Sequence, residues 1–148
     1  METNKDFEEF IKLLNENKVR YLIVGGYAYA IHAEPRYTKD LDIFYEPSQT
    51  NAGRLLQTLQ QFGMESLSLT VDDFTTQGQI IQIGYEPLRI DLINEIDGLT
   101  FRDAWDNKEE SRYGDQTIYV ISKSDLIKNK KTSGREQDML DVKKLKES

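Results

Sequence analysis

Three aspartates occur inside short apolar runs, where their carboxylates could bind metal ions. Asp40 and Asp42 lie in residues 40–45, and Asp91 lies in residues 88–93. If residues 40–45 form a strand, its two-residue side-chain period points Asp40 and Asp42 to one face, while the apolar residues beside them enter the core. Carboxylates held so close repel each other unless a cation neutralises them, and Mg²⁺ or Mn²⁺ prefers oxygen ligands. The three aspartates are therefore candidate ligands for two-metal phosphoryl or nucleotidyl transfer, with Asp91 on the side of the nucleophile.

Simpler explanations of these aspartates stay open. An Asp-x-Asp pair is a weak signal by itself, because such residues also occupy ordinary exposed strands. Asp91 has a neighbour, Arg89, two residues earlier on the same face of the expected strand, so an ion pair would also explain an acid in an apolar run. The metal site is favoured because three acids share comparable settings.

A Gly25-Gly26 pair is separated from Asp40 by thirteen residues and lies between the apolar run 21–24 and a short expected helix. Two glycines there let backbone N–H groups and a helix N-terminus approach a triphosphate without interference from Cβ atoms. Gly-Gly alone often just makes a turn, and the segment is neither a Walker A loop nor a Rossmann fingerprint. Arg36 and Thr38 flank the acids, where they would position a triphosphate; alternatively, Arg36 neutralises the loop around it.

The elements that must position these residues follow from periodicity and turn residues. The expected helices cover residues 4–16 with Thr3 as N-cap, 27–33, 51–62, 100–107, 122–130 and 135–146. The expected strands cover residues 21–24, 40–45, 65–71, 79–84, 88–93 and 116–121, with a hairpin turn at 85–87. This order predicts a single α/β (α+β) domain, residues 1–148, with a mixed sheet flanked by helices. Its core would span about residues 19–93, followed by a C-terminal helical segment over about 122–147.

Composition narrows the class of protein. A net charge of −7 argues against broad adhesion to nucleic acid or anionic membranes, and the absence of cysteine excludes disulfides and thiolate metal sites. No apolar run approaches the roughly 18 residues of a membrane span, and the polar, acidic N-terminus does not resemble a signal peptide. We therefore expect a cytoplasmic protein without a membrane partner.

Taken together, the glycine pair and the aspartates resemble the signature of the nucleotidyltransferase superfamily with the DNA polymerase beta-like fold. That signature is an apolar strand, Gly-Gly or Gly-Ser, an intervening segment and then Asp-x-Asp, matched here by residues 22–26 and 40–43, with Asp91 as the third acid. Residues 125–145 are similar to the C-terminal segment of small stand-alone bacterial members, including relatives of the toxin component of abortive-infection systems. Two departures are Gly26 in place of a serine that often contacts phosphate, and a long gap before Asp40.

The resemblance implies a fold, an activity and a site. Asp40, Asp42 and Asp91 would hold Mg²⁺ or Mn²⁺ and Asp91 would help to deprotonate the acceptor. Gly25 and Gly26 would cradle the phosphates of an NTP. The remaining implied nucleotide contacts come from two basic residues of the C-terminal segment, Lys130 and Arg135.

The acidic residues of the last expected helix are left out of this site. Asp138 and Asp141 are expected to form helix-surface salt bridges with Arg135 or Lys144.

Three functions stay open on the sequence. The first is Mg²⁺-dependent transfer of an NMP from an NTP, such as ATP, to an acceptor hydroxyl on RNA, protein or a small molecule. The second is a catalytically inactive nucleotidyltransferase-fold protein that binds or regulates a partner, for example in a toxin–antitoxin pair. The third is a metal-dependent phosphohydrolase. The sequence lacks the large helical domain of bigger relatives, so the acceptor surface would be small, supplied by an antitoxin-like partner, or completed in a homodimer.

Overall fold

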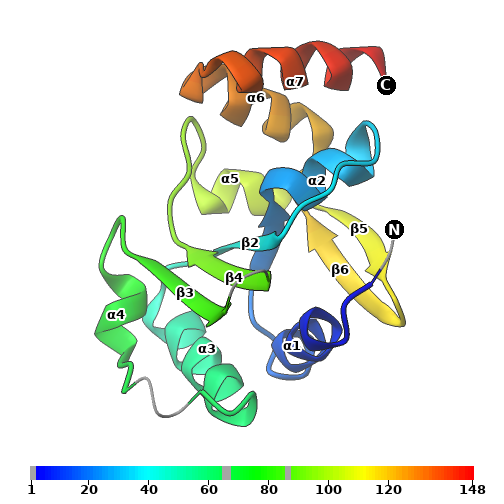
Figure 1. Ribbon diagram of the computed structural model, residues 1–148. Helices are drawn as coiled ribbons and strands as arrows, with labels where there is room; N and C mark the ends of the chain where they lie inside the picture. The colour runs from blue at the N-terminus through cyan, green and yellow to red at the C-terminus, as the bar shows by residue number, and fades with distance from the viewer. Residues whose placement is uncertain (1–2, 65–67, 86–87) are drawn as a thin grey trace.

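A six-stranded mixed sheet forms the centre of the computed structural model, which describes residues 3–64, 68–85 and 88–148 (Figure 1). The strand order is β3-β4-β2-β1-β6-β5. The pairs β2/β4 and β1/β6 are parallel, whereas β1/β2, β3/β4 and β5/β6 are antiparallel. The strands are β1 Tyr21–Val24, β2 Asp40–Tyr45, β3 Ile80–Tyr85, β4 Leu88–Ile93, β5 Glu109–Tyr113 and β6 Gln116–Val120.

Helices cover both faces of this sheet (Figure 1). On one face lie α1 Lys5–Glu16, α3 Gln49–Gln61 and α4 Val71–Thr75. On the other lie α2 Gly25–His32, α5 Phe101–Asp106, α6 Lys123–Ser133 and α7 Glu136–Glu147. Successive side chains of β2 alternate between the two layers: Phe44 packs edge-on against Phe101 of α5, and Tyr45 packs against Phe74 of α4. None of the helices in the described residues is long and apolar enough to cross a membrane.

The strand β2 is amphipathic at its start and apolar at its end, and this pattern fixes its two faces. Leu41 and Ile43 are fully buried, whereas Asp40 and Asp42 are half-buried on the opposite face. A slip of one residue in register would place the two aspartates in the apolar layer, so burial of their neighbours specifies where the carboxylates point. The carboxylates therefore face the layer that contains α2, α5 and the C-terminal helices.

Most of the expected elements are confirmed, including the mixed sheet, the antiparallel pairing of residues 79–84 with 88–93 and the two C-terminal helices. The first helix is capped by Asn4 rather than Thr3, since the Asn4 side chain accepts hydrogen bonds from the backbone N–H groups of Asp6 and Phe7. Helix α2 begins at Gly25, two residues earlier than expected. The predicted hairpin turn includes residues 86–87, which lie outside the described residues.

Two expectations about strands are wrong. Residues 68–70 are not in a strand, and Val71 begins helix α4, because Thr70 and Asp73 form a capping box. The first part of that expected strand, residues 65–67, lies outside the described residues. Strand β5 was not expected, since its sequence Glu-Glu-Ser-Arg-Tyr is polar. It pairs with β6 at the edge of the sheet, where charged side chains are common, and most of its side chains are exposed.

Candidate active site

The parallel pairing of β2 with β4 brings the three aspartates together. Asp42 lies opposite Asp91 in the register, and Asp40 lies opposite Arg89. All four side chains lie on the same face of the sheet, opposite the face on which Leu41 is buried. Two segments almost fifty residues apart thus place three carboxylates and one guanidinium beside each other.

Arg89 bridges two of the three carboxylates. Its Nε donates to Asp91 Oδ1 at 2.8 Å, and its Nη2 donates to Asp91 Oδ2 at 3.1 Å and to Asp40 Oδ2 at 3.0 Å. The ion pair with Asp91 was weighed from the sequence, whereas the bridge to Asp40 depends on the register of β2 and β4. Asp91 is the more buried of the two acids, with 12% of its side chain exposed against 35% for Asp40.

The position of Asp42 in this cluster is unfavourable for a charged carboxylate. Burial raises the pKa of its carboxyl to about 7, and the negative charges of Asp91 and Asp40 add to that rise, while Arg89 partly offsets it. The carboxyl is therefore largely protonated below neutral pH in the absence of another cation. A group of this kind gains a large electrostatic benefit from any cation that reaches it.

Gly25 allows the Asp42 carboxylate to lie against the start of α2. A Cβ atom at position 25 would lie 2.2 Å from Asp42 Oδ2, and the residue has a φ of +66°, which favours glycine. The backbone of the strand–helix turn can thus approach the carboxylate much more closely than any other residue would permit. This close approach explains why a glycine is required at position 25.

The second glycine faces the loop that leads into β2. A Cβ atom at Gly26 would lie 3.0 Å from Thr38 Oγ1, and this hydroxyl donates a hydrogen bond to the backbone oxygen of Asp40. Thr38 therefore links the glycine turn to the first aspartate. Gly25, Gly26, Thr38 and the aspartates are neighbours in space, as their proposed roles require.

Arg36 and Lys130 are directed toward a different group, the buried carboxylate of Asp141 in α7. Arg36 donates to it through Nη2 at 2.6 Å and Nη1 at 3.0 Å, and Lys130 Nζ donates at 2.8 Å. The Arg36 guanidinium also lies 3.7 Å from the centre of the Tyr29 ring. Lys130 is buried itself, and the three charges connect the loop after α2 to α6 and α7.

The expectation for Asp138 and Asp141 needs correction. Both are buried rather than on the helix surface, and Asp141 pairs with Arg36 and Lys130 instead of Lys144. The pairing of Asp138 with Arg135 is confirmed at 3.0 Å, although Lys130 also approaches Asp138.

These interactions decide the ionisation of Asp141. Burial alone would raise the pKa of the Asp141 carboxyl, but hydrogen bonds from Arg36, Lys130 and Gln137 hold this pKa well below its usual range. Asp141 is thus a fully satisfied anion, in contrast to Asp42.

The chemistry of the aspartate cluster fits a hard divalent cation. Its donors are carboxylate oxygens, and the pKa of Asp42 is raised by burial first and then by the negative charges of Asp91 and Asp40, which Arg89 only partly offsets. In the described ranges 3–64, 68–85 and 88–148, no three histidine, cysteine, aspartate or glutamate side chains are already arranged around one ion position. Arg89 lies among the acids in this arrangement.

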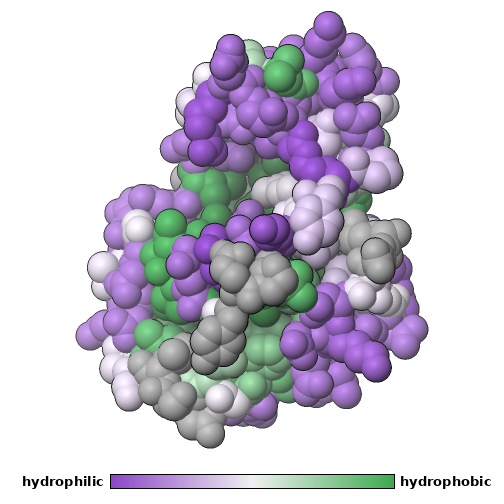
Figure 2. Space-filling model, viewed as in Figure 1, coloured by the Kyte–Doolittle hydropathy of each residue, from purple (hydrophilic) through white to green (hydrophobic). Residues whose placement is uncertain are grey.

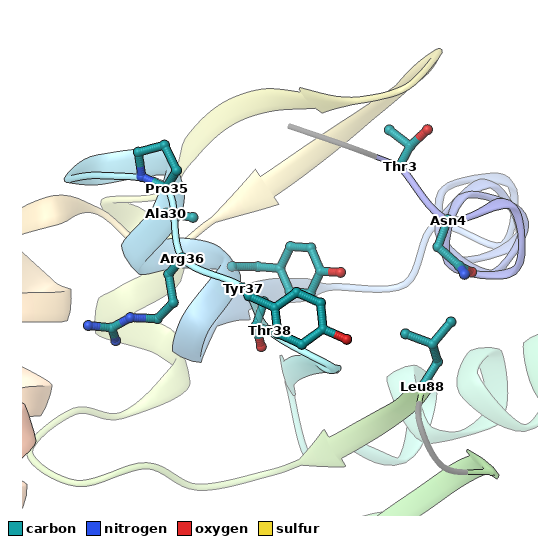
Figure 3. A pocket seen from close by; sticks show the side chains of 9 residues that line it. Thr3, Asn4, Ala30, Pro35, Arg36, Tyr37, Thr38 and Leu88 are labelled. Carbon is teal, nitrogen blue, oxygen red and sulfur yellow. The ribbon is translucent and has the colours of Figure 1, made fainter.

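A cavity of about 550 Å³ opens beside Thr38. In Figure 3, Tyr37 and Leu88 border the opening and the Arg36 side chain is directed away from them. The Tyr37 side chain is largely exposed, with 81% of its surface accessible. Sequence reasoning did not identify this cavity, since it is formed by α2, the loop before β2 and the start of β4. Its lining is Thr3, Asn4, Tyr27, Ala30, Pro35, Arg36, Tyr37, Thr38 and Leu88.

Comparisons with known proteins agree with this fold. A comparison with curated protein sequences gives no match. Among solved structures, the lincosamide antibiotic adenylyltransferase LnuA, crystallised with lincomycin, is similar with a TM-score of 0.57 and 20% sequence identity, covering 97% of this chain and 96% of that one. This similarity supports the nucleotidyltransferase fold expected from the sequence. The model of the family described as "Nucleotidyl transferase of unknown function (DUF2204)" matches residues 3–148, so the chain belongs to this family of nucleotidyltransferases.

Proposed function

We propose that this nucleotidyltransferase is Mg²⁺-dependent and moves an NMP from an NTP, with ATP as the first candidate, to the hydroxyl of a small molecule. The observation that carries the proposal is the placement of Asp40, Asp42 and Asp91 beside the Gly25 turn at the start of α2. Carboxylates alone would repel a triphosphate, so the cluster is useful to a nucleotide only together with a divalent cation. When bound, Mg²⁺ would neutralise the phosphates and favour attack on the α-phosphorus.

The chain's own residues have separate tasks in this reaction. Gly25 and Gly26 leave the backbone open to the triphosphate at the N-terminus of α2, which favours negative charge. The acceptor oxygen forms a bond to the α-phosphorus while the bond from that phosphorus to the bridging oxygen breaks, and pyrophosphate leaves. The proton of the acceptor hydroxyl passes to the carboxylate of Asp91. Lys130, Arg36 and Arg135 act indirectly, because their charges are held by Asp141 and Asp138.

The cavity beside Thr38 supports a small-molecule substrate. Its volume of about 550 Å³ lies in the range of small-molecule sites, and Tyr37, Tyr27 and Leu88 provide the apolar and aromatic lining that such sites have. We therefore assign it to the organic part of a substrate, next to the reacting phosphate. The similar structure carries a lincosamide as its bound molecule, which makes lincomycin a reasonable first acceptor to test.

A transfer assay with α-³²P-labelled NTPs and Mg²⁺ tests the proposal. The acceptors are lincomycin, other hydroxyl-bearing small molecules, tRNA and protein, and the variants are Asp42→Asn and, as a control, Asp115→Asn in the exposed turn before β6. We expect labelled product from the wild type and Asp115→Asn, and none from Asp42→Asn. Equal transfer by Asp42→Asn would refute the site, whereas release of labelled nucleotide without an acceptor would indicate a phosphohydrolase. Absence of NTP binding in the presence of Mg²⁺ would support the non-catalytic alternative.

A further inference from the structure

Arg89 binds the same carboxylate oxygens that a divalent cation would need. Three of its hydrogen bonds, at 2.8, 3.0 and 3.1 Å, involve both oxygens of Asp91 and one of Asp40. Charge-assisted bonds of this geometry are among the strong ones, and the forked guanidinium suits a pair of acids on adjacent strands. The bridge follows from the register, which places Arg89 opposite Asp40 and two residues before Asp91.

A guanidinium and a metal ion cannot use these oxygens in the same way at the same time. Mg²⁺ requires oxygen ligands at about 2.0–2.1 Å in octahedral geometry, whereas the guanidinium holds the oxygens in its own plane at about 3 Å. Placing a second cation next to the guanidinium would also add like-charge repulsion. The two cations therefore compete for Asp40 and Asp91.

We propose that Arg89 is the built-in counter-cation of the active site, which neutralises Asp40 and Asp91 before the metal binds and must leave them when it does. This inference rests on the proposed function, since it takes the aspartates to be the metal ligands. The side chain has room to move, because 29% of it is exposed, compared with 10% for Lys130, which is held between α6 and α7. Arg89 thereby lowers the metal affinity of the free enzyme and keeps the acids apart from unproductive cations.

Binding of Mn²⁺ without nucleotide tests this directly, measured by electron paramagnetic resonance of the free ion or by calorimetry. We expect Arg89→Gln to bind Mn²⁺ about tenfold more tightly than the wild type, because the competing charge and its hydrogen bonds are gone. The matched control is Arg112→Gln, which removes an exposed arginine from β5, at the other edge of the sheet. It should bind within twofold of the wild type. Unchanged or weaker Mn²⁺ binding by Arg89→Gln would overturn the inference.

The same titration on Asp42→Asn separates this inference from the proposed function. If Asp42→Asn binds Mn²⁺ as well as the wild type does, the aspartates are not the metal site and the proposed function fails. If Asp42→Asn loses binding but Arg89→Gln is unchanged, the metal site stands and the counter-cation role of Arg89 is wrong.

A measurement on the wild type covers the case in which Arg89→Gln does not fold. In protein labelled with ¹⁵N-arginine, the Nε–Hε signal of Arg89, assigned through Arg89→Lys, should shift on addition of Mg²⁺. The Nε–Hε signal of Arg112 should stay in place. An Arg89 signal that does not move at saturating Mg²⁺ would show that the bridge persists, contrary to the proposal.

Discussion

Replacing Asp42 by asparagine should stabilise the metal-free protein by an amount that grows as the pH rises from about 4 to about 7. The folded state raises the pKa of this carboxyl to about 7, through burial first and then through Asp91 and Asp40, from an ordinary value of 3.8. Between these two values the folded protein binds more protons at this site than the unfolded chain does. Stability therefore falls as the pH rises through the window from about 4 to about 7.

The size of the effect follows from the two pKa values. A difference of about three pH units corresponds to roughly 4 kcal/mol of unfolding free energy above pH 7, at 1.36 kcal/mol per unit. Because Asp42 is only half-buried, water reduces this figure, and we expect about 2 to 4 kcal/mol. Below pH 4 the carboxyl is protonated in both states, so its contribution disappears. Asparagine is neutral throughout and can donate a hydrogen bond to Asp91, as the protonated carboxyl does.

Thermal unfolding in EDTA at pH 4.5 and pH 8 measures this difference. For a protein of this size, about 2 to 4 kcal/mol raises the melting temperature of Asp42→Asn above that of the wild type by about 4 to 16 °C at pH 8. At pH 4.5 the difference should shrink to roughly a quarter of its value at pH 8, because only the start of the window between the two pKa values lies below this pH. Asp115→Asn, in an exposed turn, serves as control and should follow the wild type at both pH values.

Addition of saturating Mg²⁺ at pH 8 should reverse the order of the two proteins. The cation stabilises the wild type by binding its carboxylates, whereas Asp42→Asn has lost one of them. A variant that is less stable than the wild type by the same amount at pH 4.5 and at pH 8 would refute the reasoning. In that case Asp42 would be an ordinary structural side chain rather than a strained member of an acidic cluster.

Three further results are expected. Gly25→Ala should lose at least about tenfold in Mg²⁺–NTP affinity, measured by calorimetry, and about 1 to 3 kcal/mol in stability, measured by urea unfolding. The reason is that its Cβ would lie 2.2 Å from Asp42 Oδ2 at a φ of +66°. An affinity equal to that of the wild type would contradict this. Asp141→Asn should lose about 3 to 5 kcal/mol of unfolding free energy at pH 7, measured by urea unfolding, because Arg36 and Lys130 would lose their shared anion. Since the pKa of Asp141 is depressed in the folded state, this loss should shrink as the pH falls below about 4. As the pH is raised toward 7, the apparent Mg²⁺ affinity of the wild type, measured calorimetrically, should increase by up to tenfold per pH unit and level off above pH 7, because Asp42 loses its proton. A pH-independent affinity between pH 5 and 8 would argue against Asp42 as a ligand.

The sequence predicted the framework of the site because local patterns determine it. Alternation over residues 40–45 specifies which face Asp40 and Asp42 share, and Gly25-Gly26 marks the turn that follows an apolar strand. The pairing of strands that lie far apart in the sequence could not be predicted in this way. Nothing local states that β2 pairs with β4 in a register that sets Asp42 opposite Asp91 and Arg89 opposite Asp40. Proximity of the three acids and the Arg89–Asp91 ion pair could be hypothesised from the sequence, but the bridge from Arg89 to Asp40 could not.

The same limit applies to the polar elements. Strand β5 lies at a sheet edge and has no apolar alternation to reveal it, so only its pairing with β6 identifies it. Asp138 and Asp141 follow the spacing of helix-surface acids, yet packing of α7 against α2 and α6 buries them. Their cationic partners include Arg36, more than a hundred residues earlier in the chain. Because this burial depends on contacts with helices elsewhere in the chain, the periodicity of the α7 sequence does not predict it.

Asp141 and Asp42 show what distinguishes a structural carboxylate from a reactive one in this protein. Asp141 meets two cations and an amide donor, so its pKa is depressed and its charge is already satisfied. In the aspartate cluster, Arg89 donates hydrogen bonds to Asp91 and Asp40, and burial together with these two carboxylates raises the pKa of Asp42 to about 7. A divalent cation would gain little at Asp141 and much at Asp42. Burial alone would raise the pKa of both carboxyls, so the ratio of local cations to carboxylates separates the ion pairs of Asp141 in the C-terminal helices from the proposed site of nucleotidyl transfer.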